Sequence, residues 1–85
     1  MATVSSPPIV WYAEHTDTFA GEANYGWLRT CRVALDSDAS DRMVVRAIKA
    51  ELGLTGVPCR TISDSDTLTL DVVGSCQIVF ISREY

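Results

Sequence analysis

Residues 41–53 carry the clearest structural pattern in the chain, the spacing of a helix with one buried face. Apolar residues recur there at intervals of three and four positions: Val44, Ala47, Ile48 and Leu52. The basic residues take the opposite side of the same helix: Arg42, Arg46 and Lys49. The Asp and Ser residues of DSDAS (36–40) can cap its first turn, and Gly53 suits a left-handed C-terminal cap. We therefore predict one helix over about residues 39–52, with an i, i+4 ion pair between Asp38 and Arg42.

Two segments before this helix have the composition of strands. β-Branched and aromatic residues dominate IVWYAEH (9–15), where Trp11 and Ala13 would share one face. Residues 26–35 alternate in the same way, with apolar side chains on one face: Trp27, Cys31, Val33 and Leu35. We expect the two strands to pair with each other, and the polar residues 16–26 to form the loop that connects them. A loop of about ten residues in a compact domain often carries function.

Three strand patterns follow the helix: VPCRTIS (57–63), TLTLDVV (67–73) and CQIVFIS (76–82). SDSD (63–66) has turn chemistry. Gly74-Ser75 suits a two-residue type II′ turn, which would pair Leu70 with Val79 and Leu68 with Ile81. The last segment is apolar on both faces, which is typical of a strand in the middle of a sheet.

These patterns predict the fold class α+β, an antiparallel sheet of four or five strands with one helix packed on a face, in the order ββαβββ. A chain of 85 residues suits a single domain, since two cores would each be too small to fold unaided. We expect residues 1–8, with Pro7 and Pro8, to be a flexible lead-in and residues 9–85 to form the domain.

Composition and charge exclude several classes of function. With a net charge of -4 and only seven Lys and Arg residues, the chain is poorly suited to bind nucleic acid or anionic lipid directly. Its longest apolar stretch, Ile78 to Ile81, is far shorter than the roughly 20 residues that span a membrane. We expect a cytoplasmic protein, because there is no secretory signal pattern and the three cysteines form no even framework: Cys31, Cys59 and Cys76.

Catalytic and metal-ligating patterns are weak. His15, the only histidine, lies close to Glu14 and Asp17, so a small hydrolase centred on His15 is one alternative. The cysteines have no spacing that marks an activated nucleophile or a metal-ligand pair. We expect no catalytic residue, no metal and no cofactor.

The acidic residues are more suggestive of function. They fall into three groups, around the first loop, before the helix and around the third connection: Glu14, Asp17 and Glu22; Asp36, Asp38 and Asp41; Asp64, Asp66 and Asp71. Helix capping and turn chemistry can explain the second and third groups. The first group shares its loop with Phe19 and Tyr25, which either form the centre of an interface with a charged rim or fold back onto the core.

The segment EHTDTFAGEANYGW (Glu14 to Trp27) resembles a stretch near the N-terminus of small phage and prophage-borne proteins. Small acidic proteins from such elements include the anti-CRISPR inhibitors. The resemblance implies a non-enzymatic protein of the host bacterial cell that blocks a nucleic-acid-handling defence complex. Anti-CRISPR proteins share no common motif, so the resemblance assigns no residue a role. The three basic residues of the helix argue against simple mimicry of DNA.

We therefore expect a protein-binding inhibitor or interaction module, a monomer or weak homodimer, that binds a protein with a basic nucleic-acid-binding surface such as a CRISPR effector subunit. Its candidate partner-binding residues are Glu14, Asp17, Phe19, Glu22, Tyr25, Asp36, Asp38, Asp64 and Asp66. The carboxylates would compete with phosphates for Lys and Arg of the partner. The alternatives are the hydrolase centred on His15 and a phage structural accessory protein.

Overall fold

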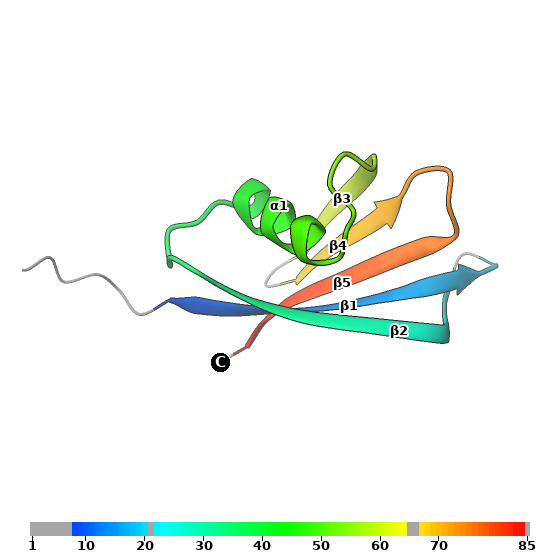
Figure 1. The fold of residues 1–85 in the computed structure, drawn as a ribbon, viewed down its shortest axis with the longest axis horizontal. Coiled ribbons are helices and arrows are strands. Elements are labelled where there is room, and N and C mark those ends of the chain that lie inside the picture. The colour runs from blue at the N-terminus through cyan, green and yellow to red at the C-terminus, as the bar shows by residue number, and fades with distance from the viewer. Residues whose placement is uncertain (1–7, 21, 65–66, 85) are drawn as a thin grey trace, which may run out of the picture.

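Five antiparallel strands form one sheet, with a single helix on one of its faces in the described part of the chain (Figure 1). The computed structural model describes residues 8–20, 22–64 and 67–84. The elements are β1 (Ile9–Phe19), β2 (Glu22–Leu35), α1 (Asp41–Glu51), β3 (Cys59–Asp64), β4 (Thr67–Val72) and β5 (Gln77–Glu84). The predicted α+β class and ββαβββ order are confirmed, with five strands.

The strands lie in the order β2-β1-β5-β4-β3, so β5 is central and the two edges are β2 and β3. The central position predicted for the last strand is therefore confirmed. β5 pairs with β4 in the predicted register, Leu70 with Val79 and Leu68 with Ile81. Because partners across a ladder share a face, these four side chains form one apolar layer.

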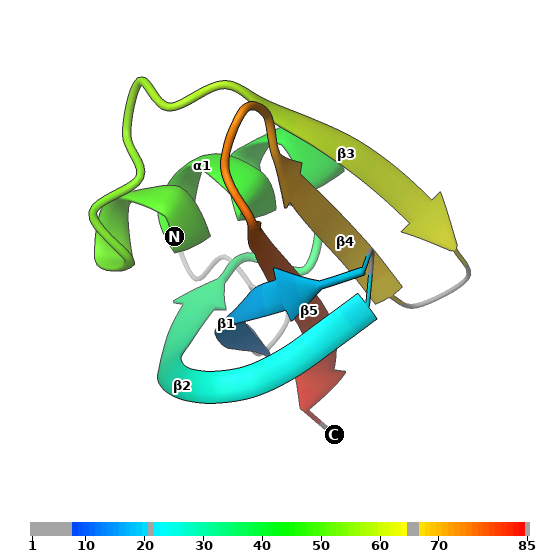
Figure 2. The ribbon, with the colours of Figure 1, turned by 90° about the vertical axis from the view of Figure 1, so that its right-hand side faces the viewer.

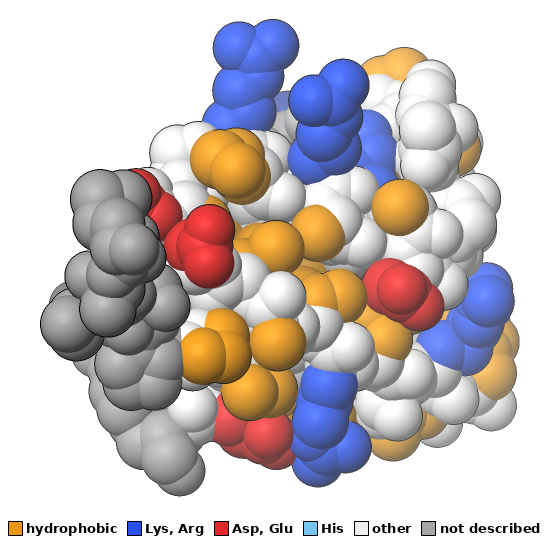
Figure 3. Space-filling model, turned by 60° about the vertical axis from the view of Figure 1, so that its left-hand side comes forward, with side chains coloured by type: hydrophobic (Ala, Val, Ile, Leu, Met, Phe, Trp, Pro, Cys, Tyr) orange, Lys and Arg blue, Asp and Glu red, His pale blue; other side chains and the backbone are white. Residues whose placement is uncertain are grey.

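The helix covers that layer. Val44 and Ile48 of α1 are fully buried in one cluster with Leu70, Val79 and Ile81. The helix starts two residues later than predicted because Ser40 caps it: the Ser40 Oγ accepts a hydrogen bond from the Met43 backbone N–H at 3.3 Å. In Figure 3, hydrophobic side chains also reach the surface in a strip with basic side chains above and below it.

The largest difference from the sequence prediction concerns residues 16–26. They do not form a ten-residue loop: β1 continues to Phe19 and β2 begins at Glu22, with these two residues paired. The hairpin they form extends one corner of the sheet, and β2 bends along its length (Figure 2). The predicted strands 9–15 and 26–35 were therefore too short at this end.

The connection between β4 and β5 also differs from the prediction. It spans four residues, Val73 to Cys76, and the Ser75 backbone N–H donates to the Val72 carbonyl oxygen at 3.3 Å. Gly74 is thus the third residue of this turn, where its φ of 77° requires a glycine, and the predicted two-residue type II′ turn is wrong. The strand register is unchanged because both turns place Leu70 opposite Val79.

Some predictions fall outside the described residues. The lead-in, apart from the exposed Pro8, and the second half of the SDSD turn, which includes Asp66, belong to segments that the structure does not describe. Ser63 and Asp64, assigned to that turn from the sequence, lie at the end of β3. Asp38 lies outside the helix, and no ion pair joins it to Arg42.

Candidate functional site

The end of the β1–β2 hairpin departs from regular pairing in a specific way. Thr16 pairs with Leu28 and Thr18 with Ala23, so residues 24–27 of β2 lie opposite the single residue Asp17. Such a bulge bends its strand and turns side chains away from the regular sheet. We call the described residues 16–20 and 22–28 the hairpin end.

Asp17 holds the bulge together. Its Oδ2 accepts a hydrogen bond from the Asn24 Nδ2 at 2.9 Å, and its Oδ1 accepts one from the Gly26 backbone N–H at 2.8 Å. The bond from Asn24, followed by that from Gly26, lowers the pKa of the Asp17 carboxyl, although some desolvation opposes this. A Cβ atom at position 26 would lie 2.9 Å from the Asp17 Oδ2, so glycine permits this close approach. Asp17 therefore stabilises the hairpin end through hydrogen bonds within the protein.

The hairpin end presents aromatic side chains to solvent. Phe19 is 74% exposed, Tyr25 54% and Trp27 40%. Tyr25 has a φ of 54°, in the left-handed region that a bulky residue rarely adopts. Phe19 and Tyr25 thus do not fold back onto the core, which was one of the two sequence-based alternatives.

Buried polar groups support the base of the hairpin end. The Thr16 hydroxyl donates to the Trp27 carbonyl oxygen at 2.7 Å, and Thr16 is fully buried. The Trp27 ring meets the His15 ring edge to face, with 4.7 Å between centroids. The His15 Nε2 lies 2.8 Å from the Gln77 Oε1 of β5, so this bond links the hairpin to the centre of the sheet. These contacts therefore fix the hairpin end to the centre of the sheet.

The other acidic candidates are spread over the molecule. Glu14 belongs to the sheet face opposite to the helix, where the Tyr12 hydroxyl donates to its Oε2 at 3.4 Å. Asp36 and Asp38 follow β2 at the end remote from the hairpin, and Asp64 ends β3 at the other edge of the sheet. Only Glu22 is an exposed carboxylate of the hairpin end. The candidate partner-binding carboxylates that the structure describes therefore do not lie on a single surface.

His15 does not have the surroundings that the hydrolase alternative requires. It is 2% exposed, and its hydrogen-bond partner is the amide of Gln77 rather than a carboxylate or a thiol. Burial, with a smaller effect of Glu51, raises the pKa of the Cys31 thiol, which is the opposite of activation. Within residues 8–20, 22–64 and 67–84, no three His, Cys, Asp or Glu residues cluster as metal ligands, and no helix is long and apolar enough to cross a membrane.

No protein-family model matches the chain, and searches of curated proteins and of solved structures found no match either.

Sequence reasoning missed three contributors to the hairpin end: Asn24, Gly26 and Trp27 as part of the bulge. Strand periodicity does not reveal these residues, because a bulge interrupts the alternation of buried and exposed side chains from which strands are predicted. The run of Asn, Tyr and Gly between two strand patterns is the only local sign of an irregular backbone here.

Proposed function

We propose that the protein is a non-enzymatic binding module that inhibits a protein partner through the hairpin end. The observation that carries this proposal is a set of exposed aromatic side chains on a fixed support: Tyr25 and Trp27 lie on the bulge that Asp17 holds by two hydrogen bonds, and Phe19 ends β1 two residues beyond Asp17. Aromatic side chains supply much of the binding energy of protein interfaces. A surface that is ordered before binding loses less conformational entropy when it binds.

The strained backbone at Tyr25 also supports a binding role for the hairpin end. A left-handed tyrosine costs about 1–2 kcal/mol relative to ordinary backbone conformations. Such strain is concentrated at functional sites, where the surrounding structure holds it in place. At Tyr25 this conformation accompanies an exposed aromatic ring that contributes little to the core.

The charge of the chain indicates the kind of partner. The exposed Glu22 beside the aromatic residues, with the net charge of -4, favours a partner with a basic surface around an apolar recess. Proteins that handle nucleic acid have such surfaces, and the resemblance of Glu14 to Trp27 to phage-borne proteins suggests a CRISPR effector among them. In this proposal the aromatic side chains anchor the complex and Glu22 steers it.

The test is inhibition of purified CRISPR effector complexes, measured as loss of guide-directed DNA binding. The wild-type protein is expected to inhibit at least one effector. The double variant Phe19→Ser/Tyr25→Asn is expected to inhibit at least about tenfold more weakly, because it removes two anchors. The matched control, Met43→Ser/Ile62→Ser, removes two apolar side chains of comparable exposure elsewhere, 55% and 49%, and should inhibit like wild type.

Equal inhibition by the two double variants would show that the hairpin end is not the binding surface. Failure of the wild-type protein across effectors of every type would refute the proposed partner. The single variant Glu22→Lys tests the steering role of Glu22, and we expect it to associate with the effector more slowly than wild type. Asp17→Lys is unsuitable for that purpose, because it would break the bulge.

A further inference from the structure

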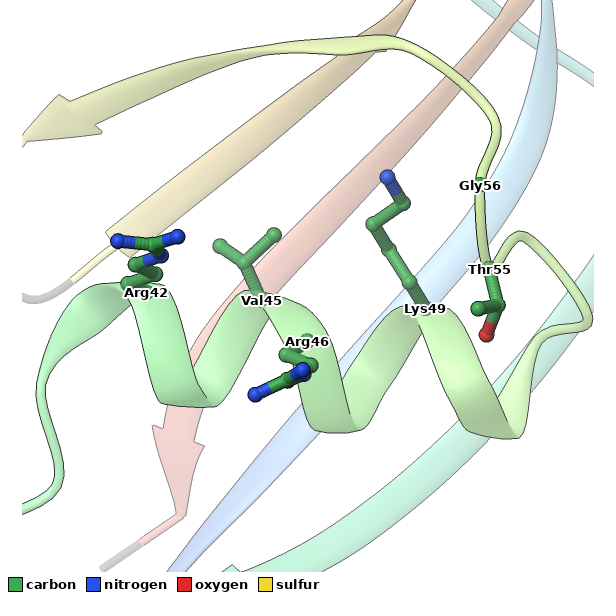
Figure 4. Close-up of a pocket in the computed structure, with 6 residues that line it drawn as sticks. All are labelled: Arg42, Val45, Arg46, Lys49, Thr55 and Gly56. Atoms are coloured by element: carbon green, nitrogen blue, oxygen red, sulfur yellow. The ribbon is translucent and has the colours of Figure 1, made fainter.

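A concave site lies between α1 and the connection that follows it, and it includes no residue of the hairpin end. The cavity has a volume of about 300 Å³ and is lined by Arg42, Val45, Arg46, Lys49, Thr55 and Gly56 (Figure 4). Three of the seven Lys and Arg residues of an acidic chain thus meet at one cavity. They do so because positions 42, 46 and 49 share one helix face.

The two arginines of this cavity have no acidic partner in the described part of the chain. The ion pair that the described residues form joins Arg32 of β2 to Glu84 of β5, away from this cavity. The carboxylate expected from the sequence to pair with Arg42, Asp38, lies before the helix and does not reach it. Two guanidinium groups, each able to donate to two oxygens at once, are therefore available to a ligand.

Lys49 has a different role in the cavity. Its Nζ donates to the Val57 carbonyl oxygen at 2.6 Å, which ties the connection after α1 to the helix. This bond keeps Thr55 and Gly56 at the cavity.

The connection adds further donors. Leu54 donates its backbone N–H to the Lys49 carbonyl oxygen, and Val57 donates to that of Leu54. The N–H groups of Thr55 and Gly56, between them, make no hydrogen bond within the described residues. Gly56 is the third residue of the turn that this Val57–Leu54 bond closes, where a φ of +83° favours glycine. With the Thr55 hydroxyl, the connection offers neutral donors at the end of the cavity remote from Arg42 (Figure 4).

We propose that this cavity binds a small ligand that carries a phosphomonoester group. Arg42 and Thr55 lie at opposite ends of the cavity (Figure 4), so the two guanidinium forks hold the tetrahedral dianion and the donors of the connection are left for polar groups of the organic part. The volume is at the lower limit of small-molecule sites, which fits one such group with a small organic part on Val45. A nucleic acid is less suitable, because the net charge of -4 on the chain would repel the rest of a polyanion.

The proposal is tested by NMR titration of the isotope-labelled protein at about 150 mM salt, an ionic strength that screens non-specific attraction. The probes are adenosine monophosphate, inorganic phosphate and uncharged adenosine. We expect saturable shifts of the Arg42 and Arg46 Nε–H groups with both phosphates, and of the Thr55 and Gly56 amides with adenosine monophosphate only. Adenosine should cause none of these shifts.

Variants locate the site. Arg42→Gln/Arg46→Gln should bind adenosine monophosphate at least about tenfold more weakly, because each lost charge-assisted bond costs about that factor. The control, Arg29→Gln/Arg60→Gln, has the same net charge but leaves the cavity intact, and should bind like wild type. Equal weakening in both variants would overturn the proposal, since it would show a general charge effect. So would an absence of saturation, or tighter binding of a single-stranded oligonucleotide than of the monophosphate at the same arginines.

Discussion

Asp17 shows how one carboxylate can fix the shape of a hairpin end. Its hydrogen bonds to Asn24 and Gly26 are made by the ionised form and lower its pKa in the folded protein. A group whose pKa falls on folding stabilises the fold above its unfolded pKa, about 3.9 for Asp. That stabilisation is lost as the pH falls through the lower, folded value.

We therefore predict a loss of stability below about pH 4 that depends on Asp17. Urea unfolding at a series of pH values should show a steeper acid decline for wild type than for Asp17→Asn, which cannot ionise. Glu22→Gln is the control, because Glu22 makes no such bonds, and its decline should match that of wild type. Identical acid profiles for wild type and Asp17→Asn would contradict this role.

Tyr25 allows the opposite kind of prediction, in which a substitution stabilises the fold. Asn tolerates the left-handed region better than tyrosine does, so Tyr25→Asn should raise the free energy of unfolding by roughly 0.5–1 kcal/mol. Chemical denaturation measures this. Glu22→Asn, at a neighbouring position without a positive φ, should give no gain. Destabilisation by Tyr25→Asn would mean that the tyrosine ring supports the fold rather than serving a partner.

Individual elements differ in how far their sequence determines them. The helix was predicted within two residues at its start and one at its end, because its apolar spacing and its Ser40 cap are local signals. The pairing of Leu70 with Val79 was also predicted, since alternation fixes the register. The pairing of β1 with β2 was expected as well, but the bulged end of their hairpin was not, because hydrogen bonds of Asp17 with residues seven and nine positions later hold the bulge.

The helix is predicted to contribute to stability mainly through its buried face. Ile48→Ala should cost about 2–5 kcal/mol, because Ile48 is fully buried against the sheet and its truncation leaves a cavity. Met43→Ala, at a 55% exposed position of the same helix, should change the unfolding free energy by no more than about 0.5 kcal/mol. Similar losses for both substitutions in urea unfolding would contradict this packing.

At the scale of the molecule, the sequence predicted the architecture but not which side chains share a surface. Glu14, Asp17 and Glu22 are close in the chain, yet they lie on a sheet face, opposite the bulge and at an exposed tip respectively. Conversely, the cations of α1 line one cavity with Thr55 and Gly56 only because the chain turns back along the helix. Both arrangements depend on tertiary contacts, which local patterns do not encode.

The central claim is that the hairpin end is an ordered aromatic surface before any partner binds. Its most direct test is ¹⁵N relaxation of the free protein, read at the amides of Asn24, Tyr25, Gly26 and Trp27. We predict order parameters of about 0.85, equal to those of β5, and a marked fall in Asp17→Ala. Order parameters below about 0.6 in the wild-type protein would contradict the claim, because a mobile bulge could not present Tyr25 in a fixed position.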